Sequence, residues 1–177
     1  PTVPEALLRE SYGWSREVKH QPQSGHDSAD TYARRAGALL ALTHVLSTTD
    51  LHADNLIATA KGPVLVDTET VLMPNWCTSK MRSNAEKSLE ESVLRTKLLP
   101  EWEANYDGEV VDVSGLAGFS EANQAFTLFS PAYVNTDAMA WVAQRKAIPT
   151  AGNSILVAGA TMPLVTLRKP LKDGFSN

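Results

Sequence analysis

The feature that most restricts the fold of this 177-residue chain is a helical pattern that runs directly into a polar loop and a hairpin. The helix is predicted from Asp27 or Ser28, either of which is a good N-cap, to about Leu46. Its apolar stripe repeats at spacings of three and four: Tyr32, Ala36, Leu39, Leu40, Thr43 and Leu46. Gly37 lies inside it, at a cost of about 1 kcal/mol relative to Ala, and marks a close backbone approach. We therefore expect one long helix that packs on a core through this stripe.

A β-hairpin is predicted directly after this helix. A polar break over residues 47–50 precedes two short aliphatic runs, 56–58 and 64–66, on either side of Lys61-Gly62-Pro63. Two such runs around a Gly-Pro turn are typical of a hairpin. The second run ends at Asp67, so an acidic side chain stands at the end of a predicted strand.

A second helix is predicted from Ser83, which forms a capping-box pattern with Glu86, to about Leu99, where Pro100 ends it. The side chains expected to be buried along it are Leu89, Val93, Leu94 and Leu98. Residues 101–134 indicate loops and extended pieces. A third helix is predicted from position 135 or 136 to just before Pro149. The signals over 151–177 are weak, with these breakers: Pro163, Pro170 and Gly174.

The chemistry of the chain is concentrated in residues 49–70. Asn55 follows Asp50 by five residues, the Asp-to-Asn interval of the catalytic loop in kinases. Asp67 follows Asp50 by 17 residues, with the predicted hairpin between them, and takes the place of the Asp in the kinase D-F-G motif. The order of helix, polar loop, hairpin and strand-end Asp is that of a kinase catalytic core.

Phosphoryl transfer depends mostly on positioning and charge neutralisation, and these residue types suit both tasks. Asp50 is expected to accept or orient the hydroxyl proton of the acceptor. Asn55 and Asp67 could supply oxygen ligands to Mg²⁺, a hard cation that needs few protein ligands. Glu69 is expected to hold a second ion or to orient Asp67. His52 is expected to contact the loop backbone or a substrate phosphate.

Each of these residues taken alone has a plainer interpretation. An isolated Asp-x-His is more often a solvated turn, and an Asp at a strand end is usually a turn former or a helix cap. The joint occurrence of Asp50, His52, Asn55 and Asp67 at kinase intervals favours a phosphotransfer-like site. Asp54 is interpreted as a turn residue.

Composition excludes several other classes. The formal net charge of −4 argues against a broad nucleic-acid interface, which usually needs a basic face. No apolar run approaches the roughly 20 residues that span a bilayer. The single cysteine, Cys77, rules out an intramolecular disulfide and a Cys-rich zinc site, and indicates a reducing, cytoplasmic compartment.

Several segments, in order, resemble the dehydratase domain of class II lanthipeptide synthetases, the LanM type. They are residues 32–41, 49–58 and 63–70, with Tyr12-Gly13-Trp14 upstream and 92–100, 112–116 and 135–139 downstream. The resemblance implies a kinase-like fold related to lipid kinases. The fold class expected here is α+β, a mainly helical C-lobe with a short catalytic β-hairpin.

The resemblance also implies an activity. Such an enzyme uses ATP and Mg²⁺ to phosphorylate Ser and Thr of a ribosomal precursor peptide that carries a leader sequence. It then eliminates the phosphate and leaves dehydroalanine or dehydrobutyrine. By motif, Asp50 matches the phosphorylation residue, His52 and Asn55 match its companions, and Asp67 and Glu69 match the metal-binding acidic pair. Arg145 is the candidate for the elimination Arg.

The chain departs from the family pattern in two positions and in extent. Asp54 stands where Glu is usual, and Thr68 where Leu is usual between the acidic pair. No β-rich N-lobe with an ATP-binding lysine and no C-terminal zinc cyclase domain are recognised. Residues 1–177 are therefore expected to be a partial dehydratase domain, the C-lobe core, that is weakly active or inactive alone.

Two other functions stay open. A small-molecule phosphotransferase of the aminoglycoside or choline kinase type shares the Asp-x-His-x-x-Asn loop, although the 32–35 motif and Glu69-Thr70 favour the dehydratase. A non-catalytic peptide-binding fragment belongs to a different class.

Overall fold

The computed structural model describes residues 4–73, 83–104, 108, 110–116, 125–147 and 152–176. The α-helices in these ranges are α1 (His26–Val45), α2 (Asn84–Glu90) and α3 (Arg168–Ser176). The 3-10 helices are η1 (Ala53–Asn55), η2 (Val93–Thr96) and η3 (Leu164–Leu167). The strands are β1 (Ala6–Leu8), β2 (Gly13–Ser15), β3 (Leu56–Thr59), β4 (Gly62–Leu65), β5 (Trp102–Ala104), β6 (Val110–Asp112), β7 (Ala125–Ala132), β8 (Ala140–Ala147), β9 (Leu156–Val157) and β10 (Ala160–Thr161).

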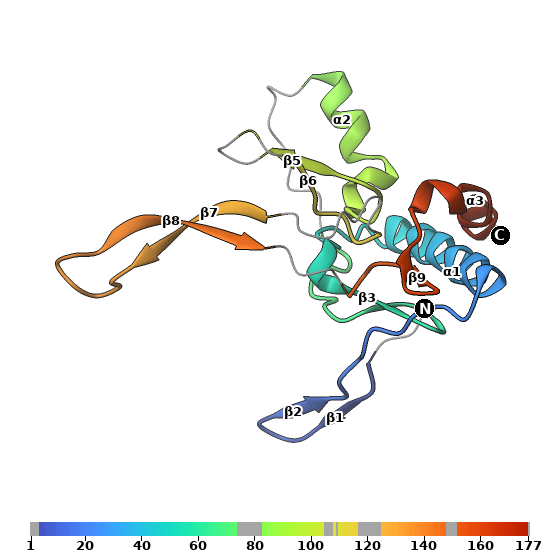
Figure 1. The fold of residues 1–177 in the computed structure, drawn as a ribbon, viewed down its shortest axis with the longest axis horizontal. Coiled ribbons are helices and arrows are strands. Elements are labelled where there is room, and N and C mark those ends of the chain that lie inside the picture. The colour runs from blue at the N-terminus through green and yellow to red at the C-terminus, as the bar shows by residue number, and fades with distance from the viewer. Residues whose placement is uncertain are drawn as a thin grey trace.

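Every described strand pairs antiparallel with its neighbour in sequence, so the sheets in these ranges are all two-stranded. The α+β class is confirmed: in the described residues, helices are interspersed with two-stranded hairpins (Figure 1). The kinase-like fold stays a prediction. None of the described helices combines the length and the apolar character that a membrane crossing needs.

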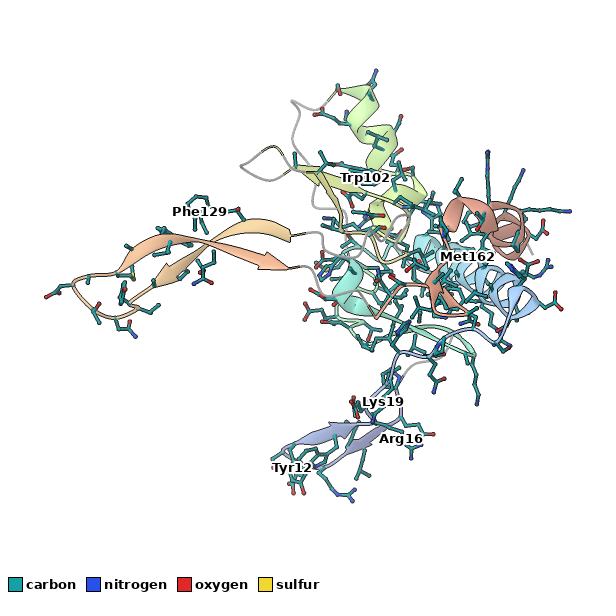
Figure 2. All side chains as sticks on the ribbon, in the orientation of Figure 1. Tyr12, Arg16, Lys19, Trp102, Phe129 and Met162 are labelled. Atoms are coloured by element: carbon teal, nitrogen blue, oxygen red, sulfur yellow. The ribbon has the colours of Figure 1, made fainter. Side chains whose placement is uncertain are left out.

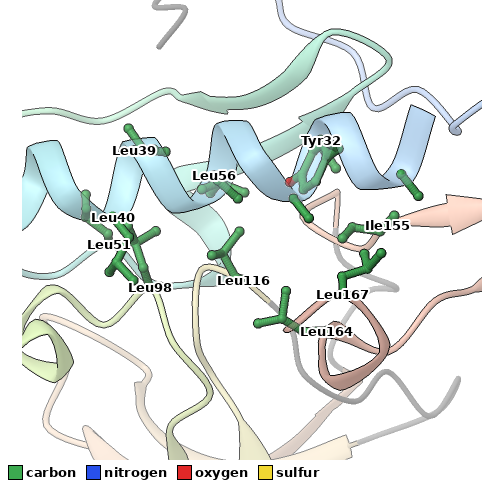
Figure 3. Packing of buried hydrophobic residues seen from close by; sticks show 14 of the residues in the cluster. Tyr32, Leu39, Leu40, Leu51, Leu56, Leu98, Leu116, Ile155, Leu164 and Leu167 are labelled. Carbon is green, nitrogen blue, oxygen red and sulfur yellow. The ribbon is translucent and has the colours of Figure 1, made fainter. Parts of the chain in front are cut away.

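The hydrophobic core lies along α1. Its stripe is buried as predicted from Tyr32 to Thr43, with Tyr32, Leu39 and Leu40 at most 3% exposed. Leu46, the last predicted member, is the C-cap and is only partly buried. Figure 3 shows Leu51 and Leu98 toward one end of α1, Leu116 near its middle, and Ile155 and Leu167 toward the other end. The core therefore joins α1 to the loop that follows it and to the C-terminal segment.

The close backbone approach predicted at Gly37 is confirmed, and its partner is α3. A Cβ on Gly37 would overlap the carbonyl oxygen of Leu171, and a Cβ on Gly174 would overlap that of Arg34. The weak signals over 151–177 concealed this helix. Pro170 is tolerated because it occupies the first turn, where backbone N–H groups have no helical acceptor. Gly174, expected as a breaker, is the residue that lets the two helices touch.

The N-cap prediction for α1 is wrong. Gly25 caps the helix without a side-chain hydrogen bond, and the Ser28 hydroxyl donates instead to Gln23 Oε1 at 2.6 Å. The Ser28 hydroxyl is thus already bonded to a residue upstream of the helix, and the N-cap lies two or three residues earlier than predicted.

The second helix begins with the predicted capping box but is shorter than predicted. It ends at Glu90 and is followed by η2, because the Ser92 hydroxyl donates to Leu89 O and accepts from Leu94 N–H. Such local hydrogen bonds compete with the helical ladder. Leu98 is fully buried, as expected, whereas Leu89 and Leu94 are about half exposed.

The predicted third helix is wrong, since residues 140–147 form β8. This strand pairs with β7 over eight residue pairs, from Ala125 opposite Ala147 to Ala132 opposite Ala140. Tyr133 and Asn135 adopt positive φ in the connecting turn, which reverses the chain. A short apolar run does not distinguish a helix from a strand, and here long-range pairing decides.

Two hairpins, β1–β2 and β7–β8, extend away from the packed body (Figure 1). In Figure 2, Tyr12 lies on the first and Phe129 on the second, both far from Met162 in the body. The aromatic side chains that are described on them are exposed, with Trp14 and Trp141 each 69% accessible.

Candidate functional site

The site is built on the loop that leaves α1. The helix ends at Val45, and Ser47 and Asp50 then take left-handed conformations, with φ of 53° and 60°. Leu51, the next residue, is fully buried, whereas Asp50 is exposed. The backbone reversal therefore anchors the loop by an apolar side chain and leaves the Asp50 carboxylate facing solvent.

Asn55 closes this loop on itself. Its Nδ2 donates to the carbonyl oxygen of Asp50 at 2.9 Å and lies 3.4 Å from His52 Nε2. The Nδ1 of His52 accepts from the Asp54 N–H at 3.3 Å and caps η1. A neutral imidazole has one acceptor nitrogen, so the tautomer of His52 selects between capping η1 and holding Asn55. The predicted contact of His52 with the loop backbone is confirmed.

Backbone hydrogen bonds hold the loop from two sides. Leu51 N–H donates to Thr96 O and Ala53 N–H donates to Val113 O, each at 3.0 Å. His52 and Ser114 form an isolated antiparallel bridge. The loop thus lies between η2 and the segment of residues 112–116.

The β3–β4 hairpin brings Asp67 to this loop. Leu56 pairs with Leu65, and Val66 N–H donates to Asn55 O at 3.1 Å, so the strand end lies beside Asn55. The predicted hairpin is confirmed, although Gly62 and Pro63 lie within β4 instead of forming the turn.

Residues 67–70 are tied back to the same loop. Asp67 Oδ1 accepts from the Glu69 N–H at 3.1 Å, which orients the carboxylate through the Glu69 backbone. The Thr70 hydroxyl donates to Thr49 O, next to Asp50. The four predicted residues Asp50, His52, Asn55 and Asp67 are therefore brought together by the backbone, with Glu69 beside them.

The donor set fits a magnesium ion. Within the described residues, Asn55 Oδ1 and the Asp50 carboxylate accept no hydrogen bond, and Asp67 is exposed. No group of three or more His, Cys, Asp or Glu side chains in those residues could hold a metal. Mg²⁺ needs only one or two protein oxygens when phosphates and water complete its octahedron. The assignment of Asn55 and Asp67 as its ligands stays a prediction.

Arg145 is not brought to the loop by any described contact. It lies in β8 opposite Thr127, and its side chain is outside the described part of the chain. Its assignment to elimination stays a prediction.

The residues that sequence reasoning missed are those of 112–116, whose only signal was that this segment is among the motifs of the resemblance.

Two comparisons with known proteins bear on this site. The family model described as "Domain of unknown function (DUF4135)" matches residues 2–177. The chain is also 32% identical over 98 residues to the lacticin 481/lactococcin biosynthesis protein LcnDR2 of Lactococcus lactis subsp. lactis. That match covers 53% of this chain and 11% of the length of the relative. Together the two matches confirm the resemblance that the motifs indicate.

Proposed function

The chain belongs to the DUF4135 family, and on that premise we propose that it carries the phosphotransfer site of a lanthipeptide dehydratase. The observation that carries the proposal is the closed loop around Asn55. Its side-chain amide donates to Asp50 O, and its backbone carbonyl accepts from the N–H of Val66, the residue before Asp67. Two hydrogen bonds thereby join Asn55 to Asp50 and to Val66.

The peptide substrate is inferred from the relative. A protein named for lacticin 481/lactococcin biosynthesis shares a third of its residues with this chain over the matched region. We infer that the chain acts within a longer enzyme, on Ser and Thr of a precursor peptide with a leader sequence. The nucleotide lobe and the cyclase domain of that enzyme would lie outside residues 1–177.

The loop residues have distinct tasks in this proposal. The Asp50 carboxylate is exposed and has no described hydrogen bond. It accepts the proton of the substrate Ser or Thr hydroxyl while the hydroxyl oxygen attacks the γ-phosphoryl group of ATP and ADP leaves. Asn55 fixes the Asp50 backbone, and His52 fixes the turn that presents Asn55. Preorganisation of this kind lowers the entropic cost of reaching the reactive geometry.

Asn55 Oδ1 and Asp67 would hold Mg²⁺, which would neutralise charge on the ATP phosphates when bound. Glu69 orients Asp67 through its backbone N–H. For the second step, we propose that Arg145 assists departure of the phosphate after the α-proton is removed, which leaves the dehydroamino acid.

The test is an Asp50→Asn substitution in the full-length protein that contains this chain. With ATP, Mg²⁺ and a leader-bearing precursor peptide, the wild-type protein is expected to remove one water per modified Ser or Thr. Asp50→Asn should lower the rate by about 10²- to 10⁴-fold, because it removes the proton acceptor. Intact-mass spectrometry of the peptide measures both the phosphorylated and the dehydrated product.

Asp54→Asn is the matched control, since Asp54 is exposed on the same loop and contributes only its backbone N–H to His52. It should stay close to the wild-type rate. Phosphate gain on an aminoglycoside or choline, without water loss from the peptide, would replace the proposal with a small-molecule phosphotransferase. Peptide binding without ATP consumption would leave a binding module instead.

A further inference from the structure

A buried polar side chain outside the predicted site contacts the segment that supports the loop. Asn153 is 1% exposed, and its Nδ2 donates to two carbonyl oxygens, those of Ser114 and Gly115, each at 3.0 Å. Two converging carbonyl acceptors require an NH₂ group, so the chemistry fixes the orientation of this amide. Ser114 is itself fully buried, and its N–H and hydroxyl donate to Asp112 Oδ1 at 3.0 and 2.6 Å.

The segment held by Asn153 is one wall of the loop that carries Asp50. Val113 O accepts from Ala53 N–H at 3.0 Å, and Ser114 forms the bridge with His52. A Cβ on Gly115 would overlap the carbonyl oxygen of Leu51. A shift of residues 113–115 would therefore displace the loop backbone on either side of His52.

Asn153 is fixed to the other half of the site as well. The preceding carbonyl, Gly152 O, accepts from Ala58 N–H in β3 at 2.6 Å. β3 pairs with β4, the strand that leads to Asp67. Asn153 thus connects the hairpin that presents Asp67 to the wall that supports Asp50.

The buried amide of Asn153 is incompletely satisfied. Its Oδ1 has no hydrogen-bond partner in the part of the chain that the structure describes. An unpaired buried acceptor is unfavourable, and an apolar residue would avoid it. What an apolar residue cannot supply is the double donor to residues 114 and 115.

We propose that Asn153 is a positioning residue, whose amide clamps residues 114 and 115 and so sets the placement of the loop 50–55 relative to Asp67. The expected effect on kcat rests on the proposed phosphotransfer function, whereas the expected displacement of the loop 50–55 does not. Substitution of Asn153 should act on turnover and not on substrate affinity, because Asp50 and Asn55 would shift together relative to Asp67.

The experiment compares Asn153→Asp with Gln23→Glu in the full-length protein. Both changes replace a buried amide by a carboxylate of the same shape and remove a donor to a backbone carbonyl. Gln23 is 3% exposed, and its Nε2 donates to Thr59 O at 2.8 Å, at the far end of the hairpin from the loop. Thermal unfolding, kcat and KM with ATP, Mg²⁺ and the precursor peptide, and amide hydrogen exchange of residues 50–55 are measured for each.

Asn153→Asp is expected to lower kcat by about 10- to 100-fold with KM values within about twofold. The amide of Ala53 should exchange faster, because its acceptor, Val113 O, lies in the displaced segment. Gln23→Glu should lower the unfolding temperature comparably and leave kcat and the exchange of residues 50–55 near wild type.

Equal effects of the two variants on kcat and on loop exchange would overturn the proposal. If Asn153→Asp does not fold, Asn153→Ser, which keeps one donor, is judged by the same readouts. If the wild-type protein does not phosphorylate the peptide, the proposed function fails on its own, and loop exchange decides the positioning role. Faster exchange of residues 50–55 in the Asn153 variant alone supports it, and unchanged exchange overturns it.

Discussion

The core along α1 and the two extended hairpins use the same residue types in opposite ways. Leu39 and Tyr32 of α1 are at most 2% exposed, whereas Leu8 of β1 is 77% exposed and Tyr133, between β7 and β8, is 69% exposed. Burial is concentrated on the elements that position the loop 50–55. The hairpins β1–β2 and β7–β8 depend on cross-strand pairing, which gives little stability to a two-stranded sheet by itself.

The largest expected difference is between two leucines. Leu39→Ala should lower the free energy of unfolding by about 2–5 kcal/mol, because it opens a cavity against the core. Leu8→Ala should change it by less than about 0.5 kcal/mol, since the side chain is already in solvent. Urea denaturation of both variants measures the contrast, and similar losses would show that the β1–β2 hairpin is packed in solution.

A smaller contrast separates two glycines. Gly37→Ala should destabilise the fold by about 1–3 kcal/mol, because the new Cβ meets the backbone of α3. The better helix propensity of Ala, about 1 kcal/mol, opposes this but does not remove a clash with backbone atoms.

Gly13→Ala in β2 is the control for this glycine. The nearest atoms to its new Cβ would be Leu8 Cδ2 at 3.2 Å, the end of an exposed side chain that can turn, and Leu7 O at 3.5 Å. It should stay within about 0.5 kcal/mol of wild type in the same measurement. A stable Gly37→Ala protein would mean that α3 does not pack on α1.

The sequence predicts α1, the β3–β4 hairpin and the capping box of α2 because their signals are local. The stripe from Tyr32 to Thr43 records burial directly, and Ser83 with Glu86 records a helix start. α3 is missed for a tertiary reason: Gly174 is required by its contact with Arg34, so the helix needs a residue that otherwise indicates a break. β8 is missed because pairing with β7, not propensity, decides its conformation.

The site is predictable to a similar degree. The intervals from Asp50 to Asn55 and Asp67 depend on one loop and one hairpin, which the chain forms from neighbouring residues. Asn153 reaches its carbonyl acceptors across 39 and 38 residues of sequence. No local pattern distinguishes such an Asn from a turn residue, so the support of the loop is visible only in three dimensions.

The smallest expected difference is between Tyr32 and Tyr133, and it concerns how the free energy of unfolding changes at alkaline pH. The Tyr32 hydroxyl is buried without a hydrogen-bond partner in the described residues, and burial raises the pKa of this phenol well above its usual value near 10. Below pH 10 the phenol is neutral in both states. Above it, the unfolded chain ionises while the folded chain stays protonated, so stability falls as pH rises, by up to about 1.4 kcal/mol per pH unit.

Tyr32→Phe should abolish this component of the alkaline loss. At neutral pH it should leave the stability unchanged or raise it by up to about 1 kcal/mol, because an unpaired buried hydroxyl is removed. Tyr133→Phe, in the exposed turn of the β7–β8 hairpin, should keep the wild-type profile. Urea denaturation between pH 8 and pH 11 measures all three proteins. Parallel profiles for wild type and Tyr32→Phe would show that the hydroxyl reaches solvent or a partner, and the core would then be less closed at Tyr32 than at Leu39.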